Sequence, residues 1–203
     1  YISQLSKNRL AISYIDGDML LVQLNEDRKF SFLRKVLPGV QSFYMQEDTL
    51  NQCYWVGTNE GIYVLDRTFQ VKKKIDINNG LAGSNIYGIL LDDYGKLWCS
   101  HQRGLSAIDT KSLQIINFDK EDGIQDWDFN NRSFLKASNG TLFFGGMKGF
   151  NYIKPPIQFK EVYKPEIYID EVTINNNLYE PEAGINKIKA IRVSNNENNI
   201  VIK

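Results

Sequence analysis

The stretch Trp98-Cys99-Ser100-His101-Gln102-Arg103-Gly104-Leu105-Ser106-Ala107-Ile108-Asp109 decides the fold of this chain, because it occurs more than once. It aligns without a gap with the segment 43 residues earlier, Trp55-Val56-Gly57-Thr58-Asn59-Glu60-Gly61-Ile62-Tyr63-Val64-Leu65-Asp66. A third copy begins at Phe143, 45 residues after Trp98, and a degenerate fourth begins at Ala11, 44 residues before Trp55. A fixed period of this size indicates a repeat architecture.

A second set of positions repeats with the same period. Gly80-Leu81 recurs 43 residues later as Gly123-Ile124, and Asp93-Tyr94-Gly95 recurs 45 residues later as Ser138-Asn139-Gly140. Within one unit, turn residues separate four short segments rich in β-branched and aromatic residues: Ile86–Asp92, Leu97–His101, Leu105–Asp109 and Gln114–Phe118. The unit therefore predicts a four-stranded antiparallel meander, which has the size of a β-propeller blade.

Six residues, at two positions of the repeat, have a predicted structural role. The large aromatic residues Trp55, Trp98 and Phe143 are expected to fill the gap between neighbouring blades. Gly61, Gly104 and Gly149 are expected in turns that need positive φ or no Cβ. We predict an all-β chain with blades at about residues 1–38, 39–80, 81–122 and 123–155. A β-sandwich with coincidental spacing is the alternative.

The pattern changes after residue 155. Lys154-Pro155-Pro156 ends the meander, and Pro165 marks a second break, so residues 156–165 are expected to form a linker. Strand-like segments then follow at Glu166–Ile174, Ile188–Val193 and Asn199–Lys203, which predicts the first strands of a sandwich domain over residues 166–203. Tyr1 begins inside a blade, and four blades are few for a closed ring, so we expect further blades upstream in a longer protein.

Composition excludes several classes of function. Lys plus Arg and Asp plus Glu each number 24, so the net charge is zero, and we expect no nucleic-acid binding. His101 is the single histidine, which excludes a multi-histidine metal site. Cys53 and Cys99 form no Cys-x-x-Cys motif, and they occupy inequivalent positions of different units, so both are expected to be free thiols.

No catalytic motif is present, neither a Gly-x-Ser-x-Gly elbow nor a phosphate-binding loop. The carboxylate pairs Asp92-Asp93 and Glu121-Asp122 lie at predicted turns, where Asp hydrogen-bonds its own backbone. We therefore predict no catalytic residue, no metal and no cofactor.

Two segments have the side chains of a ligand site. One combines an aromatic ring with amide, carboxylate and guanidinium groups, as sugar-binding surfaces do; its candidate residues are Trp127, Asp128, Asn131 and Arg132. The other, with His101 and Arg103, precedes the turn glycine Gly104. The alternative for His101 is an exposed loop histidine without a ligand, and Phe129 and Asn130 fit core and turn positions.

Residues 80–155 resemble the two-component regulator propeller repeat, in the segment from Gly80-Leu81 to Ile108-Asp109 and in the closing segment from Asp122-Gly123-Ile124 to Pro155. Residues from about 164 resemble the start of the Ig-like Y_Y_Y domain. The first unit departs from the repeat, because Ala11 stands where the others have an aromatic residue. The resemblance implies the periplasmic sensor region of a hybrid two-component system, followed in the same chain by a membrane helix, a histidine kinase and a response regulator that controls transcription.

From this resemblance we expect a ligand-sensing and signal-transmitting module that is not itself an enzyme. In the resembled family the ligand is often an oligosaccharide, and the parent protein usually forms a homodimer. Two alternatives stay open: a propeller enzyme acting on glycans, such as a lyase or a glycosidase, and a protein-interaction propeller that uses Trp127 as its anchor.

Overall fold

The computed structural model describes residues 1–14, 17–157, 168–182 and 184–203. The chain divides into two compact units, Tyr1–Ile157 and Gln158–Lys203. The described part of both units is built from strands, with three short 3-10 turns at Ile77–Asn79, Lys120–Asp122 and Ile185–Lys187. No helix in these ranges is long and apolar enough to cross a membrane.

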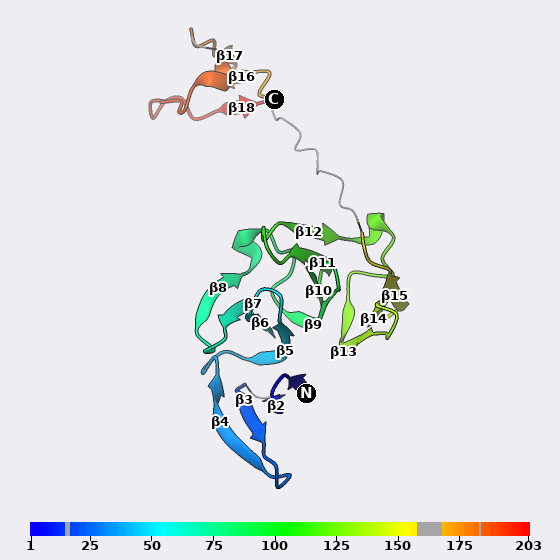
Figure 1. Ribbon diagram of the computed structural model, residues 1–203. Helices are drawn as coiled ribbons and strands as arrows, with labels where there is room; N and C mark the ends of the chain where they lie inside the picture. Colours follow the sequence, from blue (N-terminus) through cyan, green and yellow to red (C-terminus); the bar gives the residue numbers. More distant parts are fainter. Residues whose placement is uncertain (15–16, 158–167, 183) are drawn as a thin grey trace. The chain divides into compact units, whose positions relative to one another are not determined.

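The first unit consists of four antiparallel sheets in which strand order follows sequence order (Figure 1). The first three sheets have four strands each, as the repeat predicts. Their bounds are β1 (Ile2–Leu5), β2 (Arg9–Ser13), β3 (Met19–Leu24) and β4 (Phe30–Val36); β5 (Ser42–Asp48), β6 (Cys53–Thr58), β7 (Gly61–Asp66) and β8 (Val71–Ile75); β9 (Ile86–Leu91), β10 (Lys96–His101), β11 (Gly104–Asp109) and β12 (Ile115–Phe118).

The fourth sheet differs from the prediction of four strands. It has three strands in the described residues: β13 (Phe129–Lys136), β14 (Leu142–Gly146) and β15 (Gly149–Ile153). Pro155 and Pro156 follow β15, and proline has no N–H to donate to a neighbouring strand. Residues 158–167 lie outside the described part of the chain.

The predicted equivalence of the repeat aromatics is confirmed. Trp55 lies on β6 and Trp98 on β10, the second strands of consecutive sheets, and each is 1% exposed. Each indole N–H donates to a buried carboxylate of its own sheet: Trp55 to Asp48 at 3.1 Å and Trp98 to Asp92 at 3.0 Å. Phe143 occupies the corresponding place on β14 and has no N–H group that would need an acceptor.

Neighbouring sheets pack through apolar side chains. One cluster joins the first two sheets, and a second, which includes Trp55, joins the second sheet to the third. The sheets approach closely at the first strand of the third sheet, because a Cβ on Gly88 would lie 2.3 Å from the Phe134 ring. The predicted turn glycines all have positive φ, and a Cβ on Gly104 would lie 2.3 Å from the Phe118 carbonyl oxygen. Positive φ explains glycine at all three repeat positions, and a close carbonyl oxygen adds a second reason at Gly61 and Gly104.

Both cysteines are free and buried, as the repeat alignment predicts. Burial raises the pKa of the Cys99 thiol to about 12 and that of the Cys53 thiol to about 11. The two thiols are therefore protonated at neutral pH and belong to the apolar core between the second and third sheets.

The second unit has a small antiparallel sheet in its described residues. Its strand order is β17 (Asn177–Leu178), β16 (Val172–Ile174) and β18 (Ile200–Ile202), and Asn175 and Asn176, between β16 and β17, both have positive φ. The predicted strand at Ile188–Val193 is wrong: the segment is irregular and pairs with no strand among the described residues. In the predicted strand Glu166–Ile174, only Val172–Ile174 is a strand, and residues 166 and 167 lie outside the described residues.

Candidate functional site

A pocket of about 290 Å³ lies where the sheets of the first unit meet. The first strands contact one another in succession, β1 with β5, β5 with β9 and β9 with β13 (Figure 1). We call this meeting place the hub and the cavity the hub pocket. Its lining comes from all four sheets and their connecting loops: Ser13, Tyr14, Gln41, Phe43, Tyr44, Asn59, Asn85, Asn131 and Arg132.

Loops at one end of the sheets position the amide side chains. Gln41 leads into β5, and its carbonyl oxygen accepts a 3.1 Å hydrogen bond from the N–H of Asn59 in the β6–β7 turn. Asn85 leads into β9, and its N–H donates to the Gln102 Oε1 atom of the β10–β11 turn at 3.2 Å. The loop before a sheet and the turn between its second and third strands therefore lie together at this end.

A bulge in β13 carries the only predicted site residues that reach the hub pocket. The strand pairs with β14 at Phe129 and again from Phe134, and the register shifts between these positions. Asn131 and Arg132 lie within the shift, and Arg132 has a φ of 67°. A non-glycine residue in this left-handed conformation costs about 1–3 kcal/mol, and such strain gathers at binding sites.

Tyr44 connects the second sheet to this bulge. Its hydroxyl donates a hydrogen bond to the Asn131 Oδ1 atom, 87 residues away in sequence, and its ring packs edge-on against Phe134 at 4.9 Å. Burial raises the pKa of Tyr44 to about 12, although the nearby Arg132 acts in the opposite direction. Tyr44 is therefore a neutral hydrogen-bonding group at physiological pH.

Asn85 presents an unsatisfied acceptor in the same pocket. Its Oδ1 atom is buried and has no hydrogen-bond partner among the described residues. A buried polar atom left without a partner costs about 1–3 kcal/mol, so each one calls for an explanation. This oxygen is covered by protein atoms, so a molecule in the hub pocket would reach it only after the Asn85 side chain rotates.

The charges of the pocket favour an anion or a neutral polar ligand. Arg132 is the single charged residue among the described residues of its lining. No Asp, Glu or His is among the described residues of the lining. What the lining offers is a set of amides, aromatic rings and one guanidinium.

Trp127 and Asp128, the other predicted residues of this segment, lie outside the hub-pocket lining and are exposed. Asp126, beside them, forms ion pairs with Lys120 and, at 3.0 Å, with Lys148. Lys120 also lies 6.0 Å from the centre of the Trp127 ring, which is 44% exposed. The exposed aromatic ring therefore lies beside Lys120.

His101 is not the exposed loop histidine that the sequence suggests as an alternative. It is the last residue of β10, it is fully buried, and a Cβ on Gly83 would lie 2.6 Å from its Nδ1 atom. Nδ1 accepts a hydrogen bond from the Arg103 N–H at 3.1 Å, so Nε2 carries the proton and donates to the Ser106 hydroxyl at 2.7 Å. Burial lowers the pKa of His101 to about 4. Both ring nitrogens are occupied within the protein.

Arg103 is exposed and lines a second pocket, of about 410 Å³, which we call the loop pocket. Sequence reasoning missed the other seven hub-pocket residues: Ser13, Tyr14, Gln41, Phe43, Tyr44, Asn59 and Asn85. For Asn59 the sequence held one local signal: it and Gln102 are amides at equivalent positions of two repeats.

No protein-family model matches the chain. A histidine kinase, P4, of Formosa agariphila is 30% identical over 176 residues, which are 86% of this chain and 12% of that protein. The extracellular domain of a hybrid two-component system from B. thetaiotaomicron is 18% identical with a TM-score of 0.56, over 87% of this chain and 26% of that one. The WD40 β-propeller domain of Doa1 is 16% identical with a TM-score of 0.50, over 72% of this chain and 46% of that one.

The structural likenesses show the fold, and the predicted β-propeller blades are confirmed. The resemblance to the sensor region of hybrid two-component systems is likewise confirmed, by both the sequence and the fold. The chain spans only about an eighth of the curated histidine kinase that it matches.

Proposed function

We propose that this chain is part of the extracytoplasmic, periplasmic sensor region of a hybrid two-component system, and that it binds an oligosaccharide in the hub pocket. The observation that carries the proposal is the polar lining contributed by strands of the first, second and fourth sheets and by the loop before the third. The likeness to a histidine kinase and to an extracellular two-component domain supports it.

The chemistry of the lining suits sugar hydroxyls. An amide side chain both donates and accepts, as a hydroxyl does, and four amides line the pocket: Gln41, Asn59, Asn85 and Asn131. The rings of Tyr14 and Phe43 give the apolar surface on which a sugar face can stack.

A ligand at the hub can also act on the arrangement of the sheets. Its groups would contact several sheets at once, so it would bind best to one packing of β1, β5, β9 and β13. A ligand shifts an equilibrium only by this difference in affinity. The second unit, which we propose begins an Ig-like domain, would pass the change to the membrane helix and kinase of a homodimeric parent protein. Further blades would complete the ring.

The hub pocket argues against a glycan-cleaving enzyme as the alternative. A lyase or glycosidase needs a general acid and base, and glycosidases place two carboxylates around the bond. None of the described residues of the lining is a carboxylate.

The proposal is tested by titrating the whole chain with a panel of oligosaccharides in a calorimeter and repeating the titration with Asn85→Ala. We expect the substitution to lower affinity about tenfold, because it removes one hydrogen-bonding amide from the pocket lining, which contributes about 1 kcal/mol or more. Gln114→Ala is the control, since Gln114 is an exposed amide outside the hub pocket. Equal affinity for Asn85→Ala and the wild type would remove the hub pocket from ligand binding.

A further inference from the structure

The hub pocket and the loop pocket share a wall. The loop pocket is lined by Ile77, Gly80, Leu81, Ala82, Gly83, Ser84, Gln102 and Arg103. Its loop segment 80–84 runs directly into Asn85, which lines the hub pocket. The 3.2 Å hydrogen bond from the Asn85 N–H to Gln102 Oε1 joins the two linings. One loop therefore lies between two cavities at the same end of the sheets.

The two pockets use equivalent positions of consecutive repeats. Asn59, in the β6–β7 turn, lines the hub pocket, and Gln102, in the β10–β11 turn, lines the loop pocket. These residues are 43 positions apart, which is the repeat period. A chain-like ligand lying along this end would meet similar hydrogen-bonding groups at successive positions, as an oligosaccharide presents similar hydroxyls on successive units.

Each pocket also has one guanidinium and no carboxylate among its described residues. Arg132 is the one charged residue of the hub-pocket lining, and Arg103 is the one charged residue of the loop-pocket lining. Both side chains are exposed, and neither forms an ion pair within the described part of the chain. A guanidinium binds a carboxylate or sulfate through two parallel hydrogen bonds, which neutral hydroxyls cannot match in strength.

We propose that the ligand is an acidic oligosaccharide that spans both pockets, with one anionic sugar unit at Arg132 and another at Arg103. The proposal rests on the oligosaccharide-binding function proposed above. The strained backbone of the β13 bulge holds Arg132 at the hub pocket before a ligand arrives, which lowers the ordering cost of binding. Carboxylated and sulfated glycans share the required chemistry.

The test is calorimetric titration of the whole chain with three ladders of oligosaccharides, each from the monomer to the hexamer. Oligogalacturonates provide carboxylates, carrageenan oligosaccharides provide sulfates, and β-1,4-galacto-oligosaccharides are the neutral comparison. Arg132→Gln and Arg103→Gln each remove one guanidinium. Arg28→Gln is the matched control, because Arg28 is also exposed and has a positive φ, of 61°, but lies in the turn before β4, outside both pockets.

We expect an acidic ladder to bind more tightly as its length increases. Arg132→Gln should then weaken every length about tenfold, Arg103→Gln should weaken only the longer members about tenfold, and Arg28→Gln should change nothing. Neutral glycans that bind as tightly as acidic ones would overturn the acidic ligand and leave the proposed function intact. An acidic monomer that binds as tightly as the hexamer would overturn the two-pocket span. Binding of no member of any ladder would contradict both this inference and the proposed function.

Discussion

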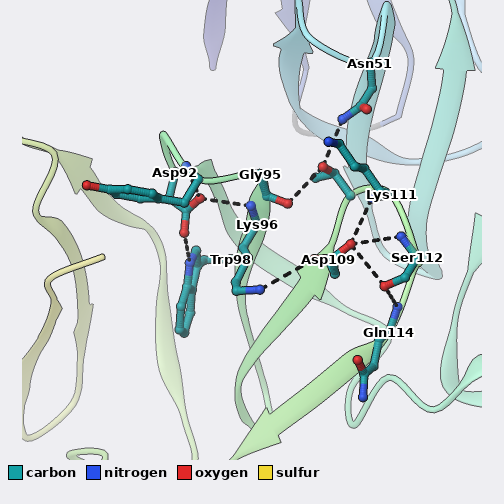
Figure 2. A network of polar contacts seen from close by, with 11 residues as sticks. Asn51, Asp92, Gly95, Lys96, Trp98, Asp109, Lys111, Ser112 and Gln114 are labelled. Carbon is teal, nitrogen blue, oxygen red and sulfur yellow. Dashed lines mark hydrogen bonds and ion pairs between the residues drawn. The ribbon is translucent and has the colours of Figure 1, made fainter. Parts of the chain in front are cut away.

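The indole N–H of Trp98 donates a 3.0 Å hydrogen bond to the Oδ2 atom of Asp92, which is 4% exposed (Figure 2). The other oxygen of this carboxylate accepts hydrogen bonds from the N–H groups of Tyr94 and Lys96, both at 2.9 Å. Asp92 thus ties the β9–β10 turn to the aromatic residue that marks the repeat. Asp48 and Trp55 make the same contact in the preceding sheet.

Loss of the Asp92 carboxylate should therefore destabilise the first unit. Asp92→Ala removes three hydrogen bonds to a charged group and leaves a buried indole N–H without an acceptor, so we expect a loss of about 2–4 kcal/mol in the free energy of unfolding. Urea denaturation followed by circular dichroism measures it. Asp93→Ala is the control, because the neighbouring Asp93 side chain is 65% exposed and should contribute less than about 1 kcal/mol. Equal losses for the two variants would contradict the role of Asp92.

The second and third sheets are joined by a polar contact that should show energetic coupling. The Asn51 Nδ2 atom donates to Thr110 Oγ1 at 2.9 Å, and this hydroxyl donates to the Gly95 carbonyl oxygen at 2.8 Å (Figure 2). Asn51→Ala and Thr110→Ala should each destabilise by about 1 kcal/mol, and the double variant by less than the sum of the two. Strict additivity in a double-mutant cycle of unfolding free energies would show that the contact contributes nothing.

His101 should make stability depend on pH on the acidic side. Its pKa is lowered to about 4 in the folded chain, against about 6.5 when unfolded, so the folded state favours the neutral ring. This contribution to the free energy of unfolding is complete above pH 6.5 and is lost as the pH falls through 4. The total loss is about 3 kcal/mol at most. NMR titration of the single imidazole should show no protonation above about pH 5. A midpoint near 6.5 in the folded protein would contradict the buried site.

The two thiols should be unreactive in the folded chain. Burial raises both pKa values well above neutral, to about 11 for Cys53 and about 12 for Cys99, so little thiolate exists at pH 8. Alkylation without reductant should label neither cysteine in buffer and both in denaturant. Protection of either thiol in denaturant would indicate a disulfide and contradict the free cysteines of the structure.

Trp127 provides a separate test of the segment predicted from sequence. Its ring is exposed and lies outside the linings of both pockets, so it would take part in binding only if a long glycan extends beyond them. Trp127→Ala should then weaken the binding of long oligosaccharides by about 30-fold and abolish a fluorescence change on binding. Unchanged affinity in the folded variant would exclude this residue from the site.

Features that depend on neighbouring residues could be predicted from the sequence. The period of 43–45 residues, the meander, the equivalent places of Trp55 and Trp98 and the positive φ of Gly104 follow from strand alternation and turn chemistry, which act within a few residues. The absence of a catalytic motif and the zero net charge also needed no structure. The prediction failed where a strand needs a distant partner, as at Ile188–Val193.

The composition of the hub pocket was decided by the tertiary structure alone. Tyr44 and Asn131 are 87 residues apart and meet because β5 and β13 both pack against β9. The sequence predicts His101 at the end of a strand, beside an exposed turn; in the structure the loop at Gly83 covers its ring, which is a buried structural group. A repeat in sequence specifies each sheet separately. A pocket between sheets depends on which side chains the packing of the sheets brings together, and no single unit of the repeat determines that packing.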